Sequence, residues 1–129
     1  MKRKKQIIHL DNNPVVLNLI KLLINEYFEQ NIIEYIAVET QQELETLLLK
    51  EVPDILITDL IGEDEQDPSS RVNLIKIIHT QYSKIKIFVL SSSTNQETQQ
   101  KLKPYISHYA YKSGDPTIFL NLLKTLLEE

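Results

Sequence analysis

The sequence has 129 residues, of which 42% are hydrophobic and 25% are charged, a composition that is ordinary for a globular protein with one hydrophobic core. We therefore expect a single domain over residues 1–129. The net charge of −4 argues against a protein that binds nucleic acid through a broad basic surface. The absence of cysteine excludes disulfides, a thiol nucleophile and cysteine-ligated metal centres.

The only basic run lies at residues 2–5. No apolar stretch of signal-peptide or membrane-span length follows it, so we interpret the run as a solvated lead-in to the first strand. We expect a cytoplasmic protein that binds neither a membrane nor nucleic acid.

Short apolar runs alternate with longer amphipathic segments along the chain, and no linker or repeat interrupts them. The runs predicted to be strands are residues 6–10, 33–38, 54–58, 85–90 and 109–111. Most of the helices predicted between and after them begin at capping residues or prolines. These starts are Asn13 with Pro14, Thr40 with Glu43, Thr94 with Glu97, and Asp115 with Pro116. A further helix over residues 71–82 is predicted from its apolar period.

Five such strand–helix units predict an α/β fold. Right-handed crossovers between parallel strands give a doubly wound, five-stranded parallel sheet of the flavodoxin-like kind, with strand order 2-1-3-4-5. The helix that begins near Thr94 has little beyond Leu102 to bury, so we expect it to be the most loosely held.

Polar residues close four of the apolar runs. They are Asp11 with Asn12, then Asp59, Ser91 and Lys112. The carboxyl ends of parallel strands meet at one edge of the sheet, so these side chains are predicted to form one pocket. A carboxylate-rich pocket with a hydroxyl and an ammonium suits a divalent cation and a phosphoryl group.

Other chemistries find less support. Two glycines, Gly62 and Gly114, cannot build a Gly-rich phosphate loop or a dinucleotide fingerprint. The three histidines have no metal-ligand spacing and are predicted to be structural or exposed. The stretch 91–94, SSST, could hold an anion at a helix start or could simply cap that helix.

Four motifs at the strand ends resemble the receiver domain of bacterial two-component response regulators, in the single-domain form typified by chemotaxis regulators. IIHLDNNP is similar to the acidic motif of the first strand, and PDILITD to the strand that carries the phosphoacceptor. VLSS and YAYK are similar to the fourth and fifth strands. The resemblance covers nearly the whole chain.

The resemblance implies a phosphoacceptor site that contains Mg²⁺. Asp59 would accept the phosphoryl group, and Asp11, Asp59 and the backbone carbonyl of Ile61 would hold the metal. Asn12 would lie at the metal site where the family usually has a second acidic residue. The two remaining site residues would contact the phosphoryl group, Ser91 through its hydroxyl and Lys112 through its ammonium.

The resemblance also implies a signalling role. A sensor histidine kinase or a phosphotransfer protein would supply the phosphoryl group from a phosphohistidine. Tyr109 would change rotamer with phosphorylation, and a downstream protein would bind the face formed by the fourth helix, fifth strand and fifth helix. A second copy of the chain is a further candidate partner. Such a protein is a self-phosphorylating switch rather than a turnover enzyme, and no output domain is expected within these residues.

Two alternatives remain open from the sequence. Asn12 removes one expected acidic ligand, so the chain could be a degenerate receiver that acts as a phosphorylation-independent adaptor or dimerisation module. A flavodoxin-like FMN binder could use residues 91–94 for the cofactor phosphate, although the acidic pocket would repel that phosphate in the absence of metal.

Overall fold

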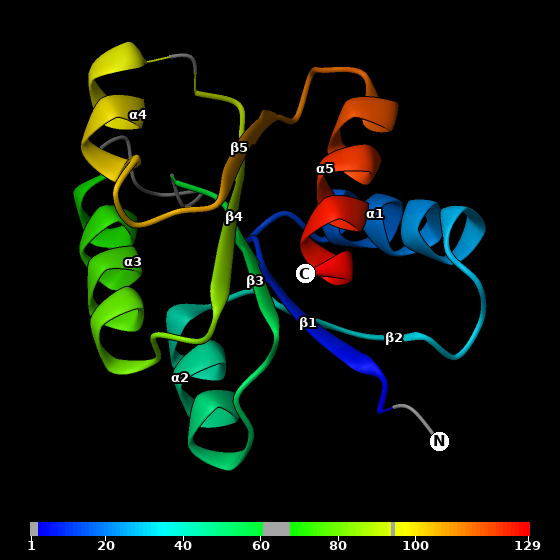
Figure 1. Ribbon diagram of the computed structural model, residues 1–129. Coiled ribbons are helices and arrows are strands. Elements are labelled where there is room, and N and C mark those ends of the chain that lie inside the picture. The colour runs from blue at the N-terminus through cyan, green and yellow to red at the C-terminus, as the bar shows by residue number, and fades with distance from the viewer. Residues whose placement is uncertain (1–2, 61–67, 94) are drawn as a thin grey trace.

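The computed structural model describes residues 3–60, 68–93 and 95–129, and these form one parallel sheet with helices on both faces (Figure 1). The strands are β1 (Lys5–Leu10), β2 (Ile33–Val38), β3 (Ile55–Thr58), β4 (Lys86–Ser91) and β5 (His108–Tyr111). Their order is β2-β1-β3-β4-β5, and every neighbouring pair is parallel. The predicted flavodoxin-like fold and strand order are confirmed.

The helices of the described part follow the strands in alternation. They are α1 (Pro14–Tyr27), α2 (Gln41–Lys50), α3 (Ser69–Gln81), α4 (Gln96–Leu102) and α5 (Pro116–Glu128). Figure 1 shows α1 and α5 on one face of the sheet and α2, α3 and α4 on the other. None of these helices has the length and apolar character needed to cross a membrane.

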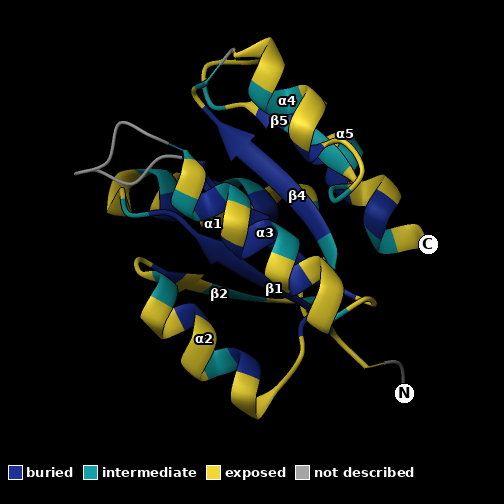
Figure 2. Ribbon diagram, turned by 90° about the vertical axis from the view of Figure 1, so that its left-hand side faces the viewer, coloured by how far each residue is buried: buried dark blue, intermediate teal, exposed yellow. Residues whose placement is uncertain are grey.

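The central strands are buried on both faces, because helices cover both sides of the sheet (Figure 2). Alternate side chains of each strand enter different cores. In β1, Ile7 packs with α1 and α5, whereas Ile8 packs with α2 and α3. In β4, Phe88 and Val89 divide between the two cores in the same way. The near-continuous apolar runs of the sequence follow from this double burial.

Three predicted caps are confirmed by hydrogen bonds. The side chains of Asn13 and Asp115 accept from backbone N–H groups two residues ahead, each at 2.9 Å, and Thr40 accepts from the N–H of Glu43 at 3.1 Å. Each bond satisfies a backbone donor that the helix itself leaves without a partner.

The predicted cap of α4 was wrong by one residue. The N-cap is Asn95, whose side chain accepts from the N–H of Thr98 at 3.0 Å, and Thr94 lies outside the described residues. Asparagine is the stronger N-cap of the two residue types, which accounts for the shift. Leu102 is the only buried residue of α4, as its composition indicated.

A polar pair lies inside the core between β1 and β2. His9 is fully buried, and its Nδ1 lies 2.6 Å from the hydroxyl of Tyr35, which also donates to the carbonyl of Leu17 at 3.2 Å. A hydroxyl has one hydrogen, so Tyr35 accepts from an Nδ1–H of neutral His9. Burial lowers the pKa of His9 to about 3, and the positive charge of Lys112 adds to this effect.

This buried histidine predicts that acid destabilises the protein. The pKa of His9 in the folded protein lies below the ordinary histidine value of about 6.5, so the unfolded chain binds the proton first and stability falls as the pH drops below that value. Between pH 7.5 and pH 5, His9 alone should lower the free energy of unfolding by about 2 kcal/mol. Urea denaturation in metal-free buffer at several pH values measures this loss.

The matched variants are His9→Asn and His79→Asn. Asparagine cannot titrate, yet its amide can still reach Tyr35, so His9→Asn should flatten the dependence of stability on pH. His79 is exposed on α3, and its variant should keep the wild-type dependence. An unchanged slope in His9→Asn would show that His9 does not cause the acid sensitivity.

Candidate functional site

Backbone pairing brings the strand ends to one edge of the sheet. The N–H of Asp11 donates to Val38 and the N–H of Asp59 donates to Leu10, both at 3.1 Å. At the other side of the edge, the N–H of Lys112 donates to the carbonyl of Ser91 at 3.0 Å. The register of the parallel sheet therefore gathers Asp11, Asp59, Ser91 and Lys112 from distant parts of the chain.

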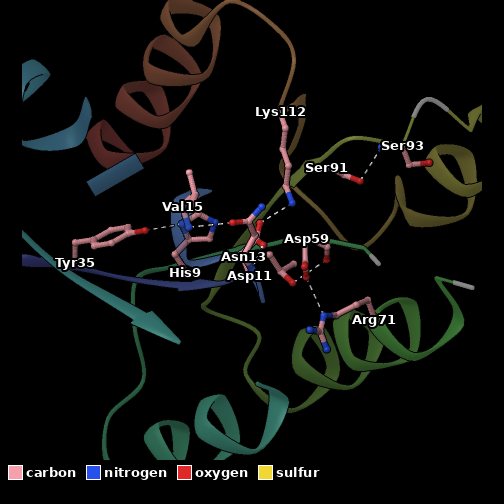
Figure 3. A network of polar contacts seen from close by, with 11 residues as sticks. His9, Asp11, Asn13, Val15, Tyr35, Asp59, Arg71, Ser91, Ser93 and Lys112 are labelled. Atoms are coloured by element: carbon pink, nitrogen blue, oxygen red, sulfur yellow. Dashed lines mark hydrogen bonds and ion pairs between the residues drawn. The ribbon is translucent and has the colours of Figure 1, made fainter. Parts of the chain in front are cut away.

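Asp11 is fully buried and is held from two directions (Figure 3). Its Oδ1 accepts from the N–H of Asn13 at 2.9 Å, within the turn that starts α1. Its Oδ2 lies 2.6 Å from Nζ of Lys112, which extends from the end of β5 and is partly exposed. The ammonium compensates the charge of a carboxylate that water does not reach.

Asp59 is paired with a second cation, Arg71, which was not among the site residues predicted from the sequence. Nε of Arg71 donates to Oδ1 of Asp59 at 2.9 Å, and both side chains are buried, with exposures of 7% and 1%. In Figure 3, Lys112 and Arg71 approach the carboxylates from opposite sides.

The signal for Arg71 was present in the sequence. Arg71 lies on the same stripe of α3 as the buried Leu74, Ile75 and Ile78, at the spacing of an inward helix face. A charged residue on such a stripe requires a buried partner of opposite charge. The neighbouring Val72, although apolar, is only partly buried.

Arg71 has a second anchor. Its Nη1 donates to Oε1 of Gln41 at the start of α2, and the hydroxyl of Ser70 donates to the same oxygen at 3.0 Å. The guanidinium is therefore fixed between the end of β3 and the start of α2.

The charge state of Asp59 reflects opposing influences. Burial raises the pKa of the Asp59 carboxyl above its ordinary value, while the hydrogen bond and positive charge of Arg71 oppose this. The negative charge of Asp11 raises the pKa further, and Lys112 lowers it. Arg71 thus favours the ionised carboxylate, which is the nucleophilic form.

Ser91 and Tyr109 meet at the turn between β4 and α4. The buried Ser91 accepts through Oγ from the N–H of Ser93 at 3.0 Å, and the half-buried Tyr109 donates to the carbonyl of Ser93 at 2.8 Å. Oγ of Ser93 in turn accepts from the N–H of Asn95 at 3.3 Å. These hydroxyls support the turn that precedes α4, whereas the helix itself is capped by Asn95.

Two other site positions were predicted from the sequence, Asn12 and Ile61. Asn12 follows Asp11 and is partly buried, and its side chain makes no hydrogen bond within the described part of the chain. Ile61, predicted to supply a backbone carbonyl, lies outside the described residues.

The donor set fits a hard divalent cation. Oδ2 of Asp59 is buried without a hydrogen-bond partner in the described segments, and Oδ2 of Asp11 has only its ion pair with Lys112. Mg²⁺ characteristically uses one or two carboxylates together with water and substrate oxygens. No group of three or more acidic, histidine or cysteine side chains suited to a metal occurs among residues 3–60, 68–93 and 95–129.

No protein-family model matches the sequence, and no curated protein matches it significantly. Solved structures do match. The isolated receiver domain of RcsB from Salmonella enterica serovar Typhimurium, with the phosphomimetic BeF3-, is 25% identical, with a TM-score of 0.80 over 97% of this chain and 89% of that one. RcsB bound to promoter rprA is also 25% identical, with a TM-score of 0.78, and this chain covers 67% of it.

A third match is a CheY-like response regulator receiver domain protein from Methanospirillum hungatei JF-1. It is 19% identical, with a TM-score of 0.77 over 97% of this chain and 94% of that one. The resemblance predicted from the strand-end motifs is confirmed in three dimensions: the chain has the fold of response regulator receiver domains.

Proposed function

We propose that residues 1–129 are a cytoplasmic receiver domain that accepts a phosphoryl group on Asp59 and signals by a change in a partner-binding face. The observation that carries this proposal is the pair of buried carboxylates, Asp11 and Asp59, beside Lys112 at one edge of a receiver-type sheet. The donor would be a phosphohistidine on a sensor histidine kinase or a phosphotransfer protein.

The transfer itself needs little from the protein beyond position and charge. A carboxylate oxygen of Asp59 attacks phosphorus, and the new P–O bond forms as the P–N bond of phosphohistidine breaks. The imidazole leaves with the electron pair. Oδ2 of Asp59 is suited to the attack, because Oδ1 is held by Arg71 whereas Oδ2 has no partner among the described residues.

Nearby side chains would meet the incoming charge. Mg²⁺, when bound by Asp11 and Asp59, supplies positive charge that offsets the repulsion between a carboxylate and a phosphoryl group. Lys112 already lies 2.6 Å from Asp11, so its ammonium can turn to a phosphoryl oxygen while it remains at the same edge. The hydroxyl of Ser91 would leave the N–H of Ser93 and donate to another phosphoryl oxygen.

Ser93 offers a route from the site to the surface. Ser91 and Tyr109 both bond its backbone, so a movement of Ser91 toward the phosphoryl group disturbs the contact that holds Tyr109. Tyr109 lies on β5 beside α4, which has a single buried residue and is therefore free to shift. Phosphorylation would bias the α4–β5–α5 face between two arrangements and change its affinity for a downstream protein or a second copy of the chain.

One observation favours a second function. Asp59 already has an internal cation in Arg71, and Asp11 has one in Lys112, so the site is charge-compensated without a ligand. A degenerate receiver that serves as an adaptor or dimerisation module needs no more than this. The two functions differ in whether Asp59 is phosphorylated.

We predict that Asp59→Asn abolishes phosphorylation without unfolding the chain. The amide is nearly isosteric with the carboxylate but is a poor nucleophile, so labelling should fall below about a tenth of the wild-type level. The wild type should require Mg²⁺. Intact mass after incubation with phosphoramidate, whose P–N bond resembles that of phosphohistidine, measures the added phosphoryl group.

Asp115→Asn is the matched control. Asp115 is an exposed N-cap, and asparagine caps as well as aspartate does, so this variant should be labelled like the wild type. Labelling of Asp59→Asn at the wild-type level would refute the assignment. A wild type that gains no phosphoryl group while its fold is intact would favour the adaptor function.

A further prediction concerns Tyr109→Phe. Loss of the hydroxyl leaves the carbonyl of Ser93 without this donor, so the free energy of unfolding should fall by about 1 kcal/mol. Labelling of Asp59 should persist, because Tyr109 contacts the turn and not the carboxylates. The phosphorylation-induced changes in the amide spectrum of residues 96–102 should shrink, because the link between site and face is broken.

Tyr111→Phe serves as the control for this variant. Tyr111 is also on β5, but its hydroxyl accepts from Gln99 of α4 at 2.7 Å and not from the turn at Ser93. The control should retain the full spectral response. An intact response in Tyr109→Phe would rule out the route through Ser93.

A further inference from the structure

The guanidinium of Arg71 occupies the place where positive charge is needed beside Asp59. It is fixed at both ends, by Oδ1 of Asp59 at 2.9 Å and by the amide of Gln41, and only 7% of the side chain is exposed. Because it is buried and anchored at two points, the guanidinium stays paired with Asp59. A metal ion that binds Asp59 must therefore share the carboxylate with Arg71 or displace it.

The formal charges of the site already cancel. Asp11 and Asp59 contribute two negative charges, and Lys112 and Arg71 contribute two positive charges at contact distance. A divalent cation placed between the carboxylates would lie close to both fixed cations, where burial leaves their repulsion poorly screened. The site therefore attracts Mg²⁺ less than two carboxylates and one lysine would.

The oxygens of Asp59 set a second constraint. A phosphorylated aspartate commits one carboxylate oxygen to phosphorus and leaves the other for the metal. Here Oδ1 is engaged by Arg71, and Oδ2 is the oxygen without a hydrogen-bond partner among the described residues. Attack on phosphorus and metal binding together require both oxygens, so Arg71 must release or share Oδ1.

We propose that Arg71 competes with Mg²⁺ for Asp59 and thereby sets how strongly the site depends on metal. This inference rests on the proposed phosphoacceptor function. Arg71 is a positioning residue in this role, since it acts by holding the carboxylate. When Asp59 is phosphorylated, the same guanidinium could donate to a phosphoryl oxygen. It would then neutralise part of the phosphoryl negative charge that Mg²⁺ otherwise neutralises.

The test is Mg²⁺ binding to unphosphorylated Arg71→Gln. Titration with MgCl2 at pH 8 is followed by the amide shifts of Asp11 and Asp59 and repeated by calorimetry. Loss of one fixed positive charge next to the ion should lower the dissociation constant by about tenfold or more. Arg71→Lys keeps the positive charge but loses the second anchor to Gln41, so its dissociation constant should lie between those of the wild type and Arg71→Gln.

Arg3→Gln is the charge-matched control. Arg3 pairs with Asp54 at 3.0 Å at the opposite end of the sheet and is largely exposed, so its loss changes the net charge equally. Its variant should bind Mg²⁺ like the wild type. Equal affinities in Arg71→Gln and Arg3→Gln, or weaker binding in Arg71→Gln, would overturn the proposal.

A second variant avoids the loss of a buried cation, should Arg71→Gln not fold. Gln41→Glu offers Arg71 a second carboxylate and should draw the guanidinium away from Asp59. Its control is Gln42→Glu, and Mg²⁺ should bind more tightly to Gln41→Glu than to this control. Gln42 is exposed on the same helix and provides the same added charge. Equal Mg²⁺ affinities in these two variants would also overturn the proposal.

Phosphoryl labelling is measured separately on every variant. Normal labelling with unchanged Mg²⁺ affinities would refute the role of Arg71 and leave the phosphoacceptor function standing. Tighter Mg²⁺ binding in Arg71→Gln without labelling in any variant would refute the phosphoacceptor function while it supports the competition at Asp59.

Discussion

Two carboxylates that are removed from water at the carboxyl edge of the sheet impose the main constraint on this molecule. An ionised group loses several kcal/mol of hydration when it is buried, so each carboxylate needs a cation or hydrogen-bond donors in return. Asp11 obtains these from Lys112 and the backbone of Asn13, and Asp59 obtains a cation in Arg71. The turn that starts α1, the end of β5 and the first turn of α3 supply these partners.

The two cations tie opposite layers of the fold to the same edge. Lys112 follows β5 and precedes α5, while Arg71 lies in the first turn of α3 and is braced by Gln41 of α2. Through Asp11 and Asp59, the two ion pairs connect this edge of the sheet to elements on both faces. The proposed switch needs such connections, because a local event must shift elements that pack elsewhere.

The turn after β4 adds a third connection. Ser91 and Tyr109 share the backbone of Ser93 as their partner, and α4, which follows, has little apolar burial to fix it. An element held by few buried contacts is cheap to move, whereas β1, β3 and β4 are buried on both sides and provide a rigid frame. The rigid frame positions the carboxylates, and the lightly held helix is the part that can respond.

The sequence by itself determined the strands, their order and the residues that gather at their ends. Doubly buried strands require long apolar runs, and parallel pairing brings the ends of such runs together, so Asp11, Asp59, Ser91 and Lys112 could be placed from the pattern alone. Local capping signals were equally informative at Asn13 and Asp115, because an N-cap depends on residues within one turn.

Only the tertiary structure decided which partners these side chains have. The pairing of Arg71 with Asp59 depends on how α3 packs against the end of β3. Ser91 is directed to Ser93 rather than to a carboxylate because the turn needs an acceptor there. These outcomes are set by packing between elements, and a periodic pattern along the chain carries no information on such packing.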